Sequence, residues 1–171
     1  MSSLLDTPAA QTVTDAAITL DEAMAFVWAE AETLDRLAYK DWLKLWTDTG
    51  LYIIPIEREG DPREALNIVY DNQDMRQARA KRLMSGFSMS SAPPARTIRT
   101  LSRFVVAEQG PGAITLRCAQ ILVEYKYTRT RTLAADVTYR LVRTADGIRI
   151  ETKSILLINS DDGLFGIGYL L

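Results

Sequence analysis

The chain has 171 residues, of which 47% are hydrophobic and 25% are charged, and its formal net charge is −2. This is the composition of an ordinary globular domain, without the excess positive charge that proteins use to neutralise nucleic-acid phosphates. The sequence contains no histidine, and Cys118 is its single cysteine. A Ser-His-Asp or Cys-His catalytic set, a histidine-ligated metal site, a Rieske cluster and an intrachain disulfide are therefore excluded within this polypeptide. We expect the chain to bind no nucleic acid and to hold no metal or cofactor of its own.

The apolar runs are too short to cross a membrane. Residues 51–56 form one of the longest, whereas a spanning helix needs about 20 residues. The first residues show no basic segment followed by an apolar one, so nothing marks the chain for secretion. Together with the lone cysteine, this predicts a cytoplasmic protein without membrane contact.

Residues 1–18 are small and polar and carry no sustained period, which predicts a flexible N-terminal arm before a single domain, residues 19–171. Thr19 and Glu22 have the spacing of a capping box, so a helix is expected to begin there and to run to about Ala38. Its apolar stripe repeats every three or four residues and consists of Leu20, Ala23, Met24, Val27, Ala31, Leu34 and Ala38.

Trp42 and Trp46 continue at helical spacing, which predicts a second short helix, a turn at residues 47–50 and a strand at residues 51–56. The two indoles would share one helix face. They could line a substrate pocket, but their large apolar area favours packing in the core.

A short strand is expected at residues 65–70, and a third helix at residues 72–85, with Asp71 as its N-cap and Gly86 past its end. Asp74 fits the N3 position. This helix is cationic, with side chains Arg76, Arg79, Lys81 and Arg82.

From about residue 95 the pattern changes to strands, and Asp146-Gly147 marks a hairpin turn. Around Cys118 the apolar residues switch from one parity to the other, which predicts a β-bulge in that strand. Residues 155–158 are apolar on both parities, as expected when one sheet face covers helices and the other meets a second surface. Helices followed by a meander predict an α+β roll, in which a strongly curved, mainly antiparallel sheet wraps around N-terminal helices like a cone.

Three stretches carry a family resemblance: EAETLDRLAYKDWLKLWTDTGLYIIP, YDNQDMRQARAKRLMSG and PPARTIRTLS. Over residues 20–171 the chain resembles the small (beta) subunits of aromatic-ring-hydroxylating (Rieske non-haem iron) dioxygenases, within the NTF2-like or SnoaL-like cone-fold group. The matching positions are Asp41, Trp42, Leu43, Asp48, Tyr52, Pro55, Arg79, Arg82, Leu83, Gly86, Pro93, Pro94, Arg96, Thr97 and Ser102. Ala95 and Arg103 depart from the family pattern, and residues 86–91 lack a tryptophan often found there.

The resemblance implies a structural small subunit without a catalytic site, which forms a trimer and caps a trimer of large (alpha) subunits in an alpha3beta3 heterohexamer. It implies that the large subunit carries the Rieske [2Fe-2S] cluster and a mononuclear Fe(II), and that a ferredoxin and a reductase deliver electrons from NAD(P)H. The complex would oxidise aromatic compounds with O2 in aromatic catabolism. The missing histidines agree with this division of labour.

Two readings of the charged residues stay open. A stand-alone SnoaL-like isomerase or dehydratase could use Asp41, Asp48 or Asp136 as a base and a tyrosine as hydrogen-bond donor. The arginines of the third helix and of the strand after it could form a solvated face, or they could pair with carboxylates of neighbouring subunits. The candidate interface residues are Arg79, Arg82, Arg96, Arg99 and Arg103.

Overall fold

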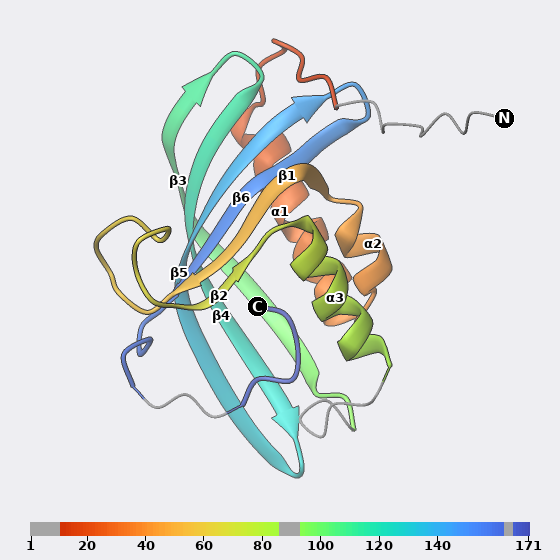
Figure 1. The fold of residues 1–171 in the computed structure, drawn as a ribbon, viewed down its shortest axis with the longest axis vertical. Coiled ribbons are helices and arrows are strands. Elements are labelled where there is room, and N and C mark those ends of the chain that lie inside the picture. The colour runs from red at the N-terminus through yellow and green to blue at the C-terminus, as the bar shows by residue number, and fades with distance from the viewer. Residues whose placement is uncertain (1–10, 86–92, 163–165) are drawn as a thin grey trace, which may run out of the picture.

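The computed structural model describes residues 11–85, 93–162 and 166–171, which form three helices packed on one six-stranded sheet (Figure 1). The strand order is β2-β1-β6-β5-β4-β3, and only the β1–β6 pair is parallel within this described part. The predicted α+β class and mainly antiparallel sheet are confirmed, while the strength of the curvature stays a prediction. The elements are α1 (Leu20–Asp35), α2 (Tyr39–Leu43), β1 (Trp46–Pro55), β2 (Asn67–Asp71), α3 (Gln73–Met84), β3 (Arg96–Gly110), β4 (Ala113–Lys126), β5 (Arg129–Thr144) and β6 (Gly147–Leu157).

Helix α1 begins with the predicted capping box. The Thr19 hydroxyl accepts the Glu22 main-chain N–H at 3.2 Å, and the Glu22 carboxylate accepts the Thr19 N–H at 2.9 Å. The helix ends at Asp35, three residues before the predicted end at Ala38, because Leu37 has a left-handed backbone with φ of 57°.

The prediction that the second helix reaches Trp46 is wrong. Helix α2 ends at Leu43, and β1 begins at Trp46, so the residues expected to form a turn belong to the strand. Pairing with β6 overrides the local helical spacing, since Trp46 lies opposite Ile150, whose N–H donates to the Leu45 carbonyl at 2.8 Å. Trp42 and Trp46 still pack edge to face, with ring centroids 5.2 Å apart, and both are buried. Their predicted place in the core is confirmed.

The N-cap of α3 is Asn72, one residue after the predicted Asp71. The Asn72 side-chain oxygen accepts the Met75 N–H at 3.0 Å, while Asp71 belongs to β2 and is buried. Gly86, expected just past the helix, lies outside the described residues, as do residues 1–10 of the predicted arm. Residues 11–18 of that arm contact the domain, because Val13 forms a bridge with Thr144 and Ile18 is fully buried.

The predicted bulge is in the wrong strand. β4 pairs with β5 without interruption from Ala113 to Lys126, and Cys118 is buried on the same parity as Leu116 and Leu122. The register instead shifts in β3 between Ser102 and Val105, where Arg103 has a φ of 55°. The apolar residues of opposite parity in β4 therefore do not turn inward; they point away from the helices.

The helices all lie against one face of the sheet, as Figure 1 shows, and the core fills the space between them. We call the helix-covered side the inner face and the opposite side the outer face. The outer face carries the exposed side chains of β3–β6, and the inner face encloses a set of buried charges.

Candidate subunit interface and buried interior

The outer face carries an exposed apolar cluster. In β4, Ile121, Val123 and Tyr125 alternate with buried residues and point outward. Ile98 of β3 pairs with Val123 and is 69% exposed, and Ile158, just after β6, is 60% exposed. Contiguous exposed apolar surface of this kind marks interaction sites. We call Ile98, Ile121, Val123, Tyr125 and Ile158 the outer patch.

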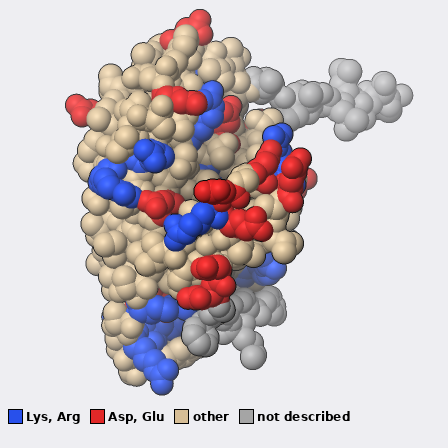
Figure 2. All heavy atoms as spheres, turned by 90° about the vertical axis from the view of Figure 1, so that its left-hand side faces the viewer, with Lys and Arg blue, Asp and Glu red and all other residues tan. Residues whose placement is uncertain are grey.

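Figure 2 looks onto this face and shows a broad uncharged area beside charged side chains of both signs, with Lys and Arg gathered at its lower end. The apolar run at residues 155–158 has the two-sided arrangement that the sequence predicts. Ile155 and Leu157 are buried against the helices, whereas Ile158 is exposed. The outer face is thus both apolar and accessible in this chain.

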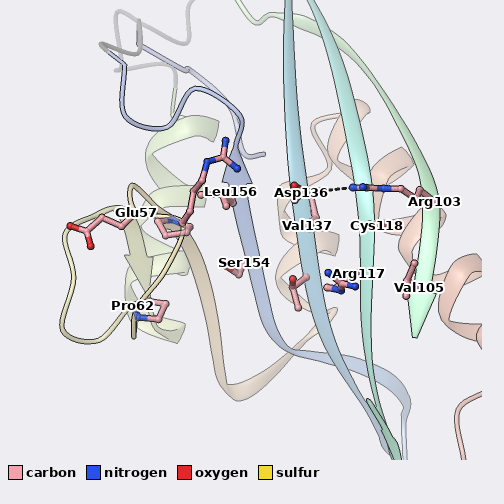
Figure 3. A pocket seen from close by; sticks show the side chains of 14 residues that line it. Glu57, Pro62, Arg103, Val105, Arg117, Cys118, Asp136, Val137, Ser154 and Leu156 are labelled. Atoms are coloured by element: carbon pink, nitrogen blue, oxygen red, sulfur yellow. Dashed lines mark hydrogen bonds and ion pairs between the residues drawn. The ribbon is translucent and has the colours of Figure 1, made fainter. Parts of the chain in front are cut away.

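A pocket of about 480 Å³ lies between strands β3–β6 and the loop at residues 56–66. Arg103 of β3 forms an ion pair with Asp136 of β5 across the intervening strand β4 (Figure 3). Both side chains are more than half exposed. Arg117 of β4 also lines the pocket, and Glu57 points away from the sheet. The pocket contains both polar and apolar side chains, and its one ion pair among the described residues, Arg103–Asp136, is of the exposed kind that contributes little to stability.

Two of the five candidate arginines point outward without a partner of opposite charge among the described residues. Arg82 is exposed on α3, and Arg96 is exposed on β3, where its guanidinium lies 4.7 Å from the centre of the Tyr125 ring. Tyr125 belongs to the outer patch, so Arg96 extends that patch with a cation. Together with Arg103, these are the candidate arginines that a second subunit could reach.

Arg79 and Arg99 are engaged within the chain. Arg79 donates to both carboxylate oxygens of Asp71, at 2.5 and 3.0 Å, and these hydrogen bonds raise the pKa of its guanidinium. The Arg99 side chain is 1% exposed and forms an ion pair with Asp35 of α1. Arg99 also donates to the main-chain oxygen of Leu170. Its guanidinium therefore offers no surface to a neighbouring subunit.

Arg76 belongs to the cationic helix that the sequence predicts, but it is buried against the first residues of β1. Its guanidinium lies 4.3 Å from the centre of the Trp46 ring and donates to the main-chain oxygens of Gly50 and Thr47. Burial lowers the pKa of Arg76 to about 10. The helix is therefore cationic on two sides, one facing the core and one facing solvent.

The inner face holds a buried charged cluster centred on Glu30 of α1. Its carboxylate accepts the Trp42 Nε1–H at 2.9 Å, the Lys153 ammonium at 2.8 Å and the Tyr139 hydroxyl at 2.7 Å. Glu30 and Lys153 are 1% and 0% exposed. Burial lowers the pKa of Lys153 and raises that of Tyr139. All three donors satisfy the carboxylate, so the cluster is a closed structural network.

Helix and strand patterns alone do not predict this cluster, although the sequence carries a signal for it. Lys153 shares the parity of Ile155 and Leu157, which places it on the apolar, inward side of β6. Glu30 lies one turn after Val27 on the buried side of α1. Lys153 is a cation on the buried side of a strand, and Glu30 is a carboxylate on the buried stripe of a helix. Two buried opposite charges are expected to form an ion pair, because an unpaired buried charge is costly.

The chain's own last residues close the inner face. Tyr169, Leu170 and Leu171 are buried, and the Leu171 N–H donates to the Tyr52 hydroxyl at 3.0 Å. Lys153 donates to the Leu171 main-chain oxygen at 3.0 Å. In Figure 1 this segment lies on the helix side of the sheet, near α3. We call residues 169–171 the tail.

The three candidate catalytic carboxylates lie on the surface and are not brought together. Asp41 of α2 pairs with Lys44, the C-cap of that helix, at 2.8 Å. Asp48 accepts a 3.4 Å hydrogen bond from Gln73, and Asp136 pairs with Arg103 on the outer face. The inward tyrosines Tyr52 and Tyr139 contact the tail and Glu30 instead. The geometry therefore does not favour the isomerase or dehydratase reading.

In residues 11–85, 93–162 and 166–171, no group of three or more His, Cys, Asp or Glu side chains could hold a metal ion. Nor does any helix of this described part have the length and apolar character needed to span a membrane.

Sequence comparison identifies the family. Residues 29–161 match the family described as "Ring hydroxylating beta subunit". The small subunit of 2-halobenzoate 1,2-dioxygenase from Burkholderia cepacia is 24% identical over 144 residues, which cover 81% of this chain and 87% of that protein. The small oxygenase component of the p-cumate 2,3-dioxygenase system from Pseudomonas putida is 26% identical over 143 residues, covering 82% and 79%.

Solved structures show the same fold. The beta subunit of benzoate 1,2-dioxygenase from Burkholderia mallei superposes with a TM-score of 0.75 at 21% identity, covering 90% of this chain and 98% of that one. An NTF2-like protein with a cystatin-like fold from Novosphingobium aromaticivorans has a TM-score of 0.56 at 14% identity, covering 81% of each chain. The predicted NTF2-like fold is confirmed. Because the family match spans most of the domain, this chain belongs to the ring-hydroxylating beta subunits, the small subunits of aromatic dioxygenases.

Proposed function

We propose that this chain is the structural small subunit of a multicomponent aromatic-ring-hydroxylating dioxygenase, and that it assembles with and stabilises a larger catalytic subunit. The family match over residues 29–161 carries the proposal. The geometry supports the proposal. The buried Glu30 and Lys153 pair with each other inside the chain, whereas the outer face exposes apolar and cationic side chains. These features fit a protein that binds other subunits better than they fit an enzyme with an active site in its interior.

The finer composition of the complex is part of the proposal. We infer a cytoplasmic heterohexamer of three large and three small subunits, in which the large subunit holds the Rieske [2Fe-2S] cluster and the mononuclear Fe(II). A ferredoxin and a reductase would supply electrons to it. The absence of histidine from this sequence supports that assignment, since both iron sites use histidine ligands.

We infer that the small subunits contact one another through the outer face and form a trimer. The outer patch supplies apolar side chains, and Arg96 and Arg103 supply guanidinium groups that suit carboxylates of neighbouring subunits. Arg82 lies on α3, on the helix side of the sheet, and takes no part in this contact. A face that combines an apolar centre with arginines has the composition of a protein–protein interface.

Coexpression tests the function. The chain is produced together with a candidate large subunit whose sequence carries a Rieske ligand pattern, and the complex is weighed by native mass spectrometry. We expect equal numbers of the two subunits, with iron and aromatic turnover present only when the large subunit is present. Stoichiometric iron in the isolated chain, or turnover of an aromatic substrate without any partner, would contradict the proposal.

A further inference from the structure

We propose that the space occupied by the tail, between Tyr52, Arg99 and Lys153, is a latent binding site for a small molecule that carries a carboxylate on an apolar body. The proposal concerns the inner face of this chain alone and does not depend on its assembly with a large subunit.

The tail is held through its main chain. Lys153 donates to the Leu171 main-chain oxygen at 3.0 Å, and the Tyr52 hydroxyl lies 3.4 Å from the same atom. Arg99 donates to the Leu170 main-chain oxygen. Two cations and a hydroxyl thus converge on two neighbouring oxygen atoms, and none of these contacts depends on which side chains the tail carries. A carboxylate offers its two oxygens to the same kind of donors.

The donors are fixed before any ligand arrives. Tyr52 and Lys153 lie directly opposite each other in the pairing of β1 with β6. Glu30 holds the Lys153 ammonium at 2.8 Å. On the other side, the Asp35 carboxylate accepts the Arg99 main-chain N–H at 2.9 Å and also forms an ion pair with its guanidinium. Preorganised donors bind an anion without a further ordering cost.

The walls suit an apolar body. The Leu170 and Leu171 side chains are 2% exposed and belong to the hydrophobic core. Beside them lies a pocket of about 210 Å³, which is lined in part by Ile54, Val69 and Leu157. A ligand that replaced the tail could use both the space left by the leucines and this adjoining pocket.

The tail competes with any such ligand because it is tethered to the site. Tethering gives a segment an effective concentration in the millimolar range. A free ligand therefore binds only at concentrations above about 1 mM, or after the tail has been displaced from the site. We therefore expect weak binding to the unmodified chain and stronger binding when the tail is released.

The variant Leu171→Lys tests this, because it keeps the chain length and places a second ammonium beside Lys153. The matched control is Leu66→Lys, at a position that is 76% exposed. Octanoate and the uncharged octanol serve as probes in calorimetric titrations of the full-length proteins. We expect octanoate to bind Leu171→Lys at least tenfold more tightly than the unmodified chain or the control, and octanol to gain less than octanoate. Adding Tyr52→Phe to Leu171→Lys should then weaken octanoate binding severalfold.

Equal octanoate affinity for all three proteins overturns the proposal, and so does equal affinity of Leu171→Lys for octanoate and octanol. Hydrogen exchange in the unmodified chain gives a readout that needs no folded variant. Octanoate at tens of millimolar, above the effective concentration of the tail, should accelerate exchange of the Leu171 amide relative to the same concentration of chloride. An unchanged rate overturns the proposal as well.

Discussion

The ammonium of Lys153 on β6 lies 2.8 Å from the carboxylate of Glu30 on α1, and both side chains are almost completely removed from solvent. The two residues are 123 positions apart in the sequence. Their ion pair connects the sheet to the helix layer. Trp42 and Tyr139 donate further hydrogen bonds to the Glu30 carboxylate. Buried pairs of this kind make the fold intolerant of losing either partner, even where the intact pair adds little net stability.

Replacing one partner of this pair should therefore be costly. We expect Lys153→Met to lower the free energy of unfolding by about 3–5 kcal/mol, because Glu30 is left buried without its counter-ion. The matched control Arg103→Met breaks an exposed pair and should cost less than about 1 kcal/mol. Urea denaturation of both variants measures the difference. A loss for Lys153→Met no larger than that of the control would contradict the structural role of the pair.

Stability should fall at alkaline pH. Burial raises the pKa of Tyr52, Tyr139 and Tyr169 above the ordinary value of 10.0. Above pH 10.0 the unfolded chain loses these protons while the folded chain keeps them, so the stability that they contribute is lost as pH rises. Burial also raises the pKa of Tyr39 and of the Cys118 thiol, which act in the same direction. The lowered pKa values of Lys153 and Arg76 act in the opposite direction, but these are two groups against five. Urea midpoints measured between about pH 8 and pH 11 should decline, together with rising tyrosinate absorbance on unfolding. Urea midpoints that stay level over this range would contradict the prediction that the raised pKa values of the buried tyrosines lower stability at alkaline pH.

The Cys118 thiol should be unreactive in the folded chain. It is 1% exposed, and burial raises its pKa to about 12. Because the thiolate is the reactive form, a thiol-modifying reagent at neutral pH should label the chain only after unfolding. The rate of labelling with and without urea checks this. Rapid stoichiometric labelling of the native protein would show that β4 opens at Cys118.

The elements that the sequence predicts well are those governed by local patterns. Thr19 and Glu22 define the start of α1 because a capping box needs only four consecutive residues. Helical spacing assigns Trp46 to α2 wrongly, because its strand partner Ile150 is distant in the sequence and strand pairing there overrides helical spacing. The parity of apolar residues assigns the bulge to the wrong strand for a similar reason. A parity switch in β4 can mean either a bulge or an apolar outer face, and only the unbroken pairing of β4 with β5 separates the two.

The candidate site shows the same limit. Composition indicates that the arginines are numerous, but only the fold separates Arg96, which faces outward, from Arg99, three positions later, which faces Asp35. Alternation alone gives the two residues opposite faces, since their spacing is odd. Which of these faces is the inner one depends on the helices. The tail could not be predicted as part of the interior, because its contacts with Tyr52 and Lys153 use main-chain atoms that every residue has.

Arg96 and Arg99 should therefore respond differently to truncation. Arg99→Ala leaves Asp35 and the Leu170 oxygen without their donor and should destabilise the chain by about 3 kcal/mol or more. Arg96→Ala removes an exposed side chain and its contact with the Tyr125 ring, and should change stability by less than about 1 kcal/mol. Thermal and urea unfolding of the two variants compare them directly. Equal effects would mean that the inward placement of Arg99 does not govern its contribution.

The outer patch gives the sharpest test of assembly. Ile121 and Val123 are exposed in the single chain, so an aspartate at either position would remain solvated and leave the fold intact. If the patch is buried between small subunits, the same aspartate would be desolvated there at a cost of several kcal/mol, which is enough to separate the subunits at micromolar concentration.

We expect Val123→Asp to sediment as a monomer under conditions in which the unmodified chain forms a trimer, with a melting temperature changed by only a few degrees. Leu66→Asp is the matched control, since Leu66 is more exposed than Val123 and lies before β2, outside the outer patch. This control should remain a trimer.

A Val123→Asp protein that keeps the trimeric sedimentation coefficient would show that the small subunits do not contact one another through the outer face. A protein that loses its fold would instead show that Val123 supports the sheet itself, so circular dichroism is recorded on the same samples to separate the two outcomes.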